Sequence, residues 1–394
     1  MNRPQPTEQN LSRQLSRRSF GQMAARMTAL LAAGASLPFY GEANLALAQL
    51  SKIGPLPADA VKINANENPL GPCPEAIDAI SKVIAKGGRY MYEDTDTFAK
   101  TLADLEGLDA EYILPFPGSS DPLHRAVLAF CSKEKPFVMS DPGYEAGGRA
   151  AQFIGAKVIK VPLTPTYAHD VKGMVKAAHE RKAGLIYICN PNNPTGTITP
   201  RAEIEWVIAN KPEDTILLLD EAYIHLTDET VGSDWVAMDK DVIILRTFSK
   251  LYGMAGLRAG AAMGRPDLIG KLEKLGAGAL PLTGMVGATA SLKVKNLVPE
   301  RRKLIKDIRE DVFAFLQKNN PRICAFGQQL LYAERENARA PIDQCDAEGK
   351  GLHRTCLARL ADARPRQHWH KRRNGEIQNR ALKGDERPAS LAVS

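Results

Sequence analysis

Short apolar runs rich in β-branched residues alternate with segments of helical periodicity along the middle of the chain. The apolar runs occupy residues 137–140, 157–161, 185–190, 216–220 and 242–246. Runs of this kind are typical of strands buried on both faces, and strands that alternate with helices are typical of parallel sheets. The pattern predicts an α/β fold, with a mostly parallel sheet covered by helices on both faces.

Two of the helical segments have recognisable starts. For the helix at residues 121–131, the sequence predicts Asp121 as the N-cap and Pro122 at the first helical position. For the helix at residues 200–210, Thr199 and Pro200 take the same two roles.

The first 48 residues have the pattern of an export signal. Arg17 and Arg18 form a twin-arginine motif, a moderately apolar stretch covers residues 23–40, and an Ala-Leu-Ala string supplies small residues for cleavage. Arg26 and many small residues make this stretch a poor membrane anchor. We therefore expect a periplasmic or exported protein that uses the twin-arginine machinery, with an amphipathic surface helix as the alternative.

The positive charge lies at the two ends of the chain. Of the formal net charge of +7, residues 1–48 hold +3 and residues 329–394 hold +4, so the middle is neutral. This distribution argues against a nucleic-acid partner. Beyond about Gln328 the apolar periodicity fades, and we expect no strand or helix there but a disordered basic tail. The six cysteines form no CxxC pair and have no nearby His at zinc-ligand spacing, which predicts free thiols or core residues and no metal site.

Four motifs follow one another at the ends of predicted strands or the starts of helices. Pro117-Gly118-Ser119-Ser120-Asp121 precedes a helix and presents backbone N–H groups and hydroxyls that can bind an anion. Asn190-Pro191-Asn192-Asn193-Pro194-Thr195-Gly196 follows a strand, where its two prolines restrict the backbone around Asn193. Taken alone, each motif could be only a helix cap or a turn.

The other two motifs carry charges beside buried strands. Asp220 ends an apolar strand, where a carboxylate needs a cationic partner such as a protonated pyridine, and Tyr223 follows it. Lys250 follows another strand, and a desolvated lysine is a nucleophile toward an aldehyde. Arg258, with Thr247 and Ser249, could hold a phosphate. A strand-ending Asp cap and a solvated Lys are the structural alternatives.

Together the four motifs, in this order and at this spacing, resemble the class I/II aminotransferases of pyridoxal-phosphate fold type I, and most closely the histidinol-phosphate aminotransferase group. The resemblance covers roughly residues 61–321. The segment 64–72, which contains Asn68, is similar to the group's N-terminal segment beside the substrate site. Arg89-Tyr90 and Asp141-Pro142-Gly143-Tyr144 resemble two further motifs of the group.

The resemblance implies pyridoxal 5'-phosphate as the cofactor and gives each motif a role around its ring. Lys250 would bind the cofactor aldehyde and carry the proton, and Asp220 would keep the ring nitrogen protonated. Tyr144 would stack on the ring, while Asn193 and Tyr223 would hydrogen-bond its hydroxyl.

The resemblance also implies how the cofactor phosphate is held and how the chain assembles. The phosphate would be bound by Ser119, Ser120, Thr247, Ser249 and Arg258. Tyr90 would reach the phosphate of a neighbouring subunit, so a homodimer is expected.

The expected organisation has five parts. These are a signal peptide (1–48), the N-terminal segment of a small domain (49–80), a cofactor-binding large domain (81–300), the start of a C-terminal small domain (301–328) and an aberrant basic tail (329–394).

The tail departs from the family pattern. Members end in a small-domain string such as Val-Arg-Val-Ser-Ile-Gly-Thr, whose Arg binds the substrate carboxylate, and this chain has no such string. Moving the reading frame forward by one nucleotide over residues 364–378 permits that ending, with the Arg in place of Pro365. Trp369 has a single codon and forces the Gly of the string. We therefore expect a frameshift near residue 328, by mutation or sequencing error, and doubtful activity of the chain as written.

The function that these residues predict is amino-group transfer between an amino acid or amine donor and a 2-oxo acid. Two alternatives stay open. Lys250 and Asp220 would serve a decarboxylase, a racemase or a lyase of the same fold equally well. A chain without its substrate Arg could also be a non-catalytic remnant that binds only the cofactor.

Overall fold

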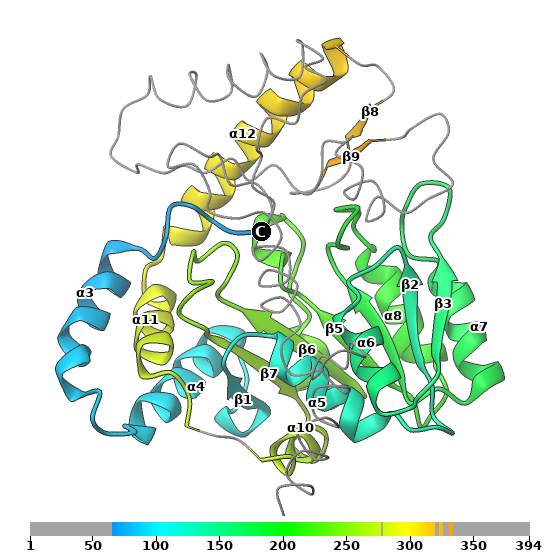
Figure 1. The fold of residues 1–394 in the computed structure, drawn as a ribbon, viewed down its shortest axis with the longest axis horizontal. Helices are drawn as coiled ribbons and strands as arrows, with labels where there is room; N and C mark the ends of the chain where they lie inside the picture. Colours follow the sequence, from blue (N-terminus) through cyan, green and yellow to red (C-terminus); the bar gives the residue numbers. More distant parts are fainter. Residues whose placement is uncertain (1–64, 277–278, 320–322, 326–330, 334–394) are drawn as a thin grey trace, which may run out of the picture.

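The computed structural model describes residues 65–276, 279–319, 323–325 and 331–333, and Figure 1 shows their arrangement. The predicted signal peptide, residues 49–64 and most of the basic tail lie outside the described residues.

A seven-stranded sheet forms the centre of the described chain, in the order β1-β7-β6-β5-β4-β2-β3. Its strands are β1 (Ile113–Phe116), β2 (Phe137–Asp141), β3 (Val158–Pro162), β4 (Leu185–Cys189), β5 (Ile216–Asp220), β6 (Val242–Thr247) and β7 (Gly260–Gly264). The five strands from β3 to β6 in this order are parallel, and β7 pairs antiparallel with both β1 and β6. The mostly parallel sheet expected from the sequence is confirmed.

The apolar pattern did not predict β1 and β7. All five residues of β7 are buried, but they are Gly, Ala and Met, which lack the β-branched signature of a strand. Small residues are required there because a Cβ on Gly260 would lie 2.6 Å from the carbonyl oxygen of Arg246 and from the backbone of Gly118. The backbones of β6 and the loop after β1 therefore pack directly on this strand.

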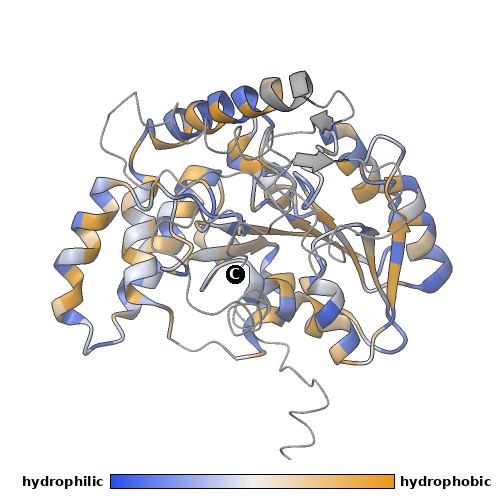
Figure 2. Cartoon of the chain, turned by 45° about the horizontal axis from the view of Figure 1, so that its top comes forward, coloured by the Kyte–Doolittle hydropathy of each residue, from blue (hydrophilic) through white to orange (hydrophobic). Residues whose placement is uncertain are grey.

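Helices surround the sheet, and α11 packs against α3 and α4 at one side of it (Figure 1). The helices are α3 (Pro74–Val83), α4 (Tyr92–Glu106), α5 (Ser120–Phe130), α6 (Ala146–Phe153), α7 (Val171–Arg181), α8 (Arg201–Asn210), α9 (Ser233–Ala237), α10 (Pro266–Glu273), α11 (Leu282–Leu292) and α12 (Leu297–Asn319). Short 3-10 turns occur at η2 (Ile84–Lys86), η3 (Ala110–Tyr112) and η4 (Ile224–Leu226). In Figure 2 the strands are mainly orange while the helices carry both colours, as expected for buried strands and amphipathic helices.

Both predicted helix starts need correction. Helix α5 begins at Ser120 with Ser119 as its N-cap, and Asp121 instead forms an ion pair with Arg125, with Nε and Oδ1 2.8 Å apart. Pro122 did not fix the start because proline is tolerated throughout the first helical turn.

Helix α8 begins at Arg201 with Pro200 as its N-cap. Thr199 is not its N-cap, because this residue is engaged elsewhere: its N–H donates to Asn190 Oδ1 at 2.9 Å and its hydroxyl bonds the Nδ1 of His169 at 2.8 Å.

The expectation that no strand or helix lies beyond residue 328 needs correction, while the domain boundaries stay predictions. Strand β8 (Ile323–Ala325) pairs antiparallel with β9 (Leu331–Ala333), so an element exists beyond residue 328, where none was expected. A three-residue strand is too short to show a periodic pattern. The predicted boundaries at 80/81 and 300/301 both fall inside helices, α3 and α12.

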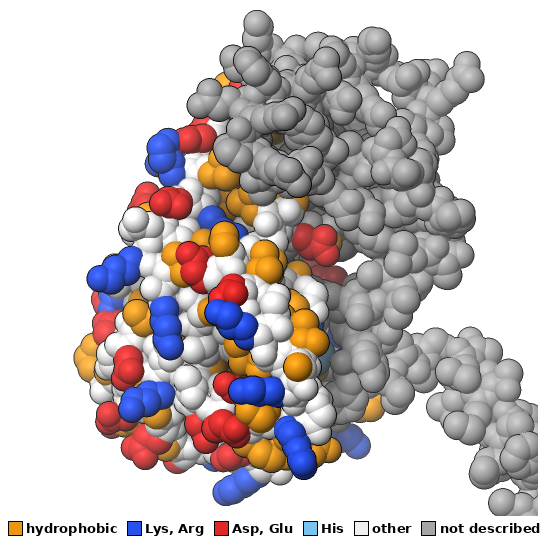
Figure 3. Space-filling model, turned by 90° about the vertical axis from the view of Figure 1, so that its left-hand side faces the viewer, with side chains coloured by type: hydrophobic (Ala, Val, Ile, Leu, Met, Phe, Trp, Pro, Cys, Tyr) orange, Lys and Arg blue, Asp and Glu red, His pale blue; other side chains and the backbone are white. Residues whose placement is uncertain are grey.

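The surface charges and the cysteines of the described residues agree with what the sequence predicts. On the face in Figure 3, basic and acidic side chains are intermixed, in agreement with the neutral middle of the chain. Cys73, Cys131 and Cys189 are buried free thiols. Among the described residues, no helix combines the length and apolar character needed to cross a membrane.

Candidate active site

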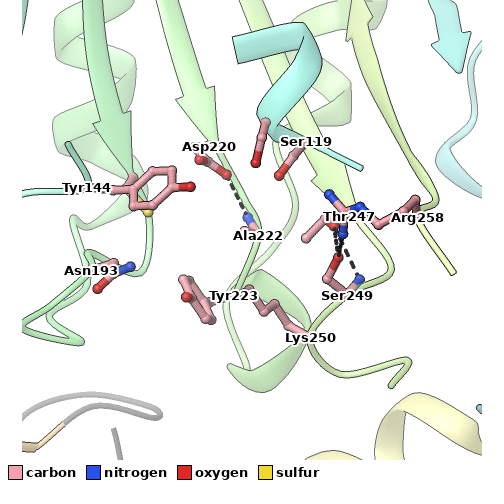
Figure 4. A pocket seen from close by; sticks show the side chains of 12 residues that line it. Ser119, Tyr144, Asn193, Asp220, Ala222, Tyr223, Thr247, Ser249, Lys250 and Arg258 are labelled. Carbon is pink, nitrogen blue, oxygen red and sulfur yellow. Dashed lines mark hydrogen bonds between the residues drawn. The ribbon is translucent and has the colours of Figure 1, made fainter. Parts of the chain in front are cut away.

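An open pocket of about 390 Å³, part of it open to solvent, lies at the carboxyl ends of the parallel strands β4, β5 and β6, where ligands of α/β sheets bind. It is lined by Ser119, Ser120, Tyr144, Cys189, Asn193, Asp220, Ala222, Tyr223, Thr247, Ser249, Lys250 and Arg258. Ten of these twelve residues were candidates from the sequence, and Cys189 and Ala222 were not. In Figure 4, Tyr144 and Asn193 lie on one side of the space and Ser249 and Arg258 on the other.

Asp220 places a buried carboxylate in the wall of the pocket. The residue is only 3% exposed, and its Oδ1 accepts the N–H of Ala222 at 3.1 Å. Its Oδ2 accepts the hydroxyl of Tyr187 at 2.9 Å. A carboxylate that lines a pocket at this depth favours a ligand with a positive charge at that point.

An ion pair behind the pocket joins the ends of β5 and β6. The guanidinium of Arg246, which is fully buried, lies 2.8 Å from Glu221, the residue after Asp220, and 3.4 Å from Glu106. Burial raises the pKa of Glu221 to about 7, although Arg246 opposes that shift. The pair ties the neighbour of Asp220 to the strand that leads to Lys250.

The opposite side of the pocket suits an anion. Ser119 and Ser120 stand at the N-terminus of α5, where backbone N–H groups and the helix dipole favour negative charge. Arg258 Nη1 donates to the hydroxyl of Ser249 at 3.1 Å, and the hydroxyl of Thr247 donates to Ser249 Oγ at 3.0 Å. Four hydroxyl side chains and one guanidinium thus form an anion cradle, whose hydrogen-bond donors and positive charge suit a phosphate.

Gly118 makes room for this cradle, which gives a first prediction. Its φ is +94°, and a Cβ at this position would overlap the guanidinium of Arg258. We expect Gly118→Ala to weaken binding of pyridoxal phosphate about 10- to 100-fold, since a charge-assisted hydrogen bond contributes about 1.5–3 kcal/mol. Fluorescence titration of the apoprotein measures the affinity.

Gly256→Ala is the matched control, because a Cβ there meets nothing within 4 Å. If both variants bind the cofactor as tightly as the unaltered chain, the cradle does not hold its phosphate.

Lys250 lies at the edge of the pocket in contact with the N-terminal segment. Its Nζ donates to the carbonyl oxygen of Asn66 at 3.1 Å and lies 5.5 Å from the centroid of the Tyr223 ring. Asn66 Nδ2 also donates to the hydroxyl of Tyr223 at 2.7 Å. Asn66 was not a candidate, although its segment was, because a single Asn in a run of Asn residues carries no signal that separates it from its neighbours.

Asn193 belongs to a loop that is fixed by its own hydrogen bonds. The N–H of Asn192 donates to Thr197 O at 2.9 Å, and Asn192 Nδ2 donates to Thr195 Oγ1 at 2.8 Å. The hydroxyl of Thr197 donates to the carbonyl of Tyr167 at 2.7 Å. These bonds hold the loop against the segment between β3 and α7 that contains Tyr167. Asn193 of this loop lines the pocket.

Two candidates lie away from the pocket lining. Tyr90 is 71% exposed, and its ring stacks on that of Tyr92 with centroids 5.7 Å apart. Asn68 is buried, and its Nδ2 donates to the carbonyl oxygen of Leu251 at 2.8 Å, so it supports the backbone next to Lys250. Roles of Tyr90 toward a partner and of Asn68 toward a substrate stay predictions.

The comparison with known families agrees with this geometry. The family described as "Aminotransferase class I and II" matches residues 58–329 of the chain. The chain belongs to this family. Its fold, its enzymatic nature, its reaction type and its dependence on pyridoxal phosphate, all expected from the sequence, are confirmed at the level of the family.

Individual aminotransferases are similar over more than half of the chain. The aromatic amino acid aminotransferase of Cutibacterium acnes is 31% identical over 293 residues, which cover 73% of this chain and 82% of the relative. Histidinol-phosphate aminotransferase 1 of Nitrosococcus oceani is 38% identical over 219 residues, 55% of this chain and 59% of the relative.

A solved structure supports the cofactor assignment. The histidinol-phosphate aminotransferase of Sinorhizobium meliloti, in complex with pyridoxal-5'-phosphate, has a TM-score of 0.65 and 25% identity, and covers 72% of this chain and 76% of its own. The residues of the present pocket fit pyridoxal phosphate, because a buried carboxylate, a lysine and an anion cradle line one space.

Proposed function

We propose that this aminotransferase transfers an amino group from an amino acid or amine with an aromatic or imidazole ring to a 2-oxo acid. The single observation that carries the reaction type is the convergence of Lys250, Asp220 and the anion cradle on one pocket. The ring-bearing donor is supported by relatives named for aromatic amino acids and for histidinol phosphate.

We propose a distinct task for each group of pocket residues. Pyridoxal phosphate, when bound, supplies an aldehyde that reacts with amines and a ring that withdraws electrons from the donor Cα. Lys250 Nζ would bind the aldehyde and would then move the proton of the donor Cα. Asp220 would hold a proton at the ring nitrogen, Asn193 and Tyr223 would hydrogen-bond the ring hydroxyl, and Tyr144 would stack on the ring; all four residues line the pocket.

We propose that the cradle residues would hold the cofactor phosphate and so anchor the cofactor in the pocket. These residues are Ser119, Ser120, Thr247, Ser249 and Arg258.

The test mixes the holoprotein with single donors in the absence of an acceptor. Transfer converts the cofactor to its aminated form, which absorbs at shorter wavelength, and releases a 2-oxo acid. Release of CO₂, ammonia or the donor enantiomer instead would identify one of the other reactions of this fold. A cofactor spectrum that no donor alters would identify a cofactor-binding remnant.

We propose a homodimer in which Tyr90 reaches the partner's cofactor phosphate. Tyr90, Tyr92 and Ile84 are each more than 60% exposed and lie close together in sequence, and such an apolar group favours a protein contact. Sedimentation at several concentrations measures the assembly. A monomer at all concentrations would contradict the proposal.

We propose that the reading frame shifts near residue 328. The family match ends at residue 329, where the basic tail begins. Correcting one nucleotide there should restore the Arg in place of Pro365 and raise kcat/KM for amino acid donors by about 10²–10³-fold, since a buried carboxylate without its partner costs about 3–5 kcal/mol.

The control is the corrected chain with that Arg changed to Met, which should return to the low value. Equal kcat/KM for the chain as written and the corrected chain would show that the tail holds a carboxylate-binding Arg of its own.

We propose that the chain is exported by the twin-arginine route, which carries folded proteins with their cofactors. Arg17→Lys together with Arg18→Lys should leave the protein in the cytoplasm with its leader uncleaved, because the route requires the arginine pair. Cell fractionation and the mass of the N-terminus measure the outcome. Arg13→Lys is the matched control, and periplasmic recovery of the double variant would rule the route out.

A further inference from the structure

Tyr187 lies behind the pocket wall, beside the Asp220 carboxylate. It stands on β4, two residues before Cys189, and Cys189 pairs in register with Asp220 on β5. Because side chains two residues apart point to the same face of a strand, Tyr187 is a diagonal neighbour of Asp220. Its hydroxyl donates to Asp220 Oδ2 at 2.9 Å.

The Tyr187 ring is held in place by packing. The residue is 2% exposed and Phe137 on β2 is fully buried, and their rings stack with centroids 5.8 Å apart and an interplanar angle of 28°. Gly147 on α6 allows this stack, because a Cβ there would lie 2.6 Å from Phe137 Cζ. A phenol packed in this way presents its hydroxyl to Asp220 at a fixed position.

The hydrogen bond has a defined direction. Burial, together with Asp220 and Cys189, raises the pKa of Tyr187 well above its usual value, so the phenol keeps its proton and acts as the donor. A hydrogen bond donated to a carboxylate stabilises its ionised form. The N–H of Ala222 makes the same kind of bond to Oδ1. Both oxygens of Asp220 therefore accept a hydrogen bond from the protein.

We propose that Tyr187 is a positioning residue that keeps Asp220 ionised and oriented, so that the proton shared with the cofactor ring stays on the ring nitrogen. The proposal rests on the proposed role of Asp220. Without the phenol hydroxyl, Asp220 Oδ2 would lose this hydrogen bond. Protonation of Asp220 would then become more favourable, and the shared proton would move from the ring nitrogen toward the carboxylate.

The test compares two ligands on one protein. One is pyridoxal phosphate and the other is its analogue with a C–H group in place of the ring nitrogen, and both have the same aldehyde and phosphate. The dissociation constant of the analogue divided by that of pyridoxal phosphate measures what the ring nitrogen contributes to binding. We expect Tyr187→Phe to reduce this ratio about tenfold, because the bond that it removes stabilises a charged group.

A merely structural role would weaken both ligands equally and leave the ratio unchanged. The nitrogen-15 signal of ring-labelled cofactor gives a second measure. It should report a protonated nitrogen in the unaltered chain and a shift toward the unprotonated position in Tyr187→Phe. An unchanged ratio with an unchanged nitrogen-15 signal would overturn the proposal.

Tyr112→Phe is the matched control, because Tyr112 also donates to an aspartate, Asp239, at 2.9 Å, but on the surface. It should change neither measurement. If Tyr187→Phe does not fold, Phe137→Leu removes the ring below Tyr187 and should reduce the same ratio to a smaller extent; no reduction would also overturn the proposal. If the unaltered chain itself bound both ligands equally tightly, the proposed role of Asp220 at the ring nitrogen would be wrong.

Discussion

Lys250→Ala should abolish covalent attachment of pyridoxal phosphate and the visible absorbance of the lysine-bound cofactor. Lys250→Arg should lose both as well, because a guanidinium keeps the charge but does not condense with the aldehyde. The loss of the proton carrier should also slow amino transfer by about 10²–10⁴-fold. Borohydride reduction followed by peptide mass analysis detects attachment, and rapid mixing with a donor measures the transfer rate.

The structure explains why the effect should be confined to chemistry. Lys250 is half-buried, and its Nζ donates a hydrogen bond to the carbonyl oxygen of Asn66. The anion cradle consists of other side chains, so Lys250→Ala should still bind the cofactor non-covalently. Lys211→Ala is a suitable control because this lysine pairs with Asp241 away from the pocket. A borohydride-reducible adduct that persists in Lys250→Ala would place the attachment at another lysine.

The sequence predicted the site more fully than the fold around it. Asp220 and Thr247 end apolar strands and Lys250 follows one, so a motif search along the predicted sheet places all three at one edge. Strand β7 was missed because close backbone contacts select Gly and Ala there, which removes the apolar signal.

The supporting residues could not be predicted in the same way. Tyr187 sits within an apolar strand, where a tyrosine normally indicates core packing, and only the register of β4 against β5 brings its hydroxyl to Asp220. Asn66 contacts Lys250 and Tyr223 across 184 and 157 residues of sequence. Long-range contacts of this kind depend on how the elements pack, which a local pattern does not encode.

Asp220→Ala should retain part of the cofactor affinity and lose about 10²–10³-fold in the rate of amino transfer. The physical reason is charge. The carboxylate is 3% exposed and lines the pocket, so a protonated ring nitrogen beside it would lose the counter-ion that Asp220 supplies, at a cost of about 3–5 kcal/mol. The ring would then bind in its neutral form and withdraw electrons less strongly from the donor.

Asp220→Asn separates charge from shape in this prediction, because an amide keeps the volume. Its Oδ1 can still accept the N–H of Ala222, and its Nδ2 can donate to the hydroxyl oxygen of Tyr187, which reverses the direction of that bond. It should lose nearly as much rate as Asp220→Ala while unfolding at a higher temperature. Asp141→Asn is the matched control: Asp141 also ends a parallel strand, but it is exposed and pairs with Lys160 at 3.2 Å. Single-turnover rates with one donor measure all three variants. A near-normal rate in Asp220→Asn would mean that this carboxylate only closes the end of β5, and the ring nitrogen would have to find its partner elsewhere.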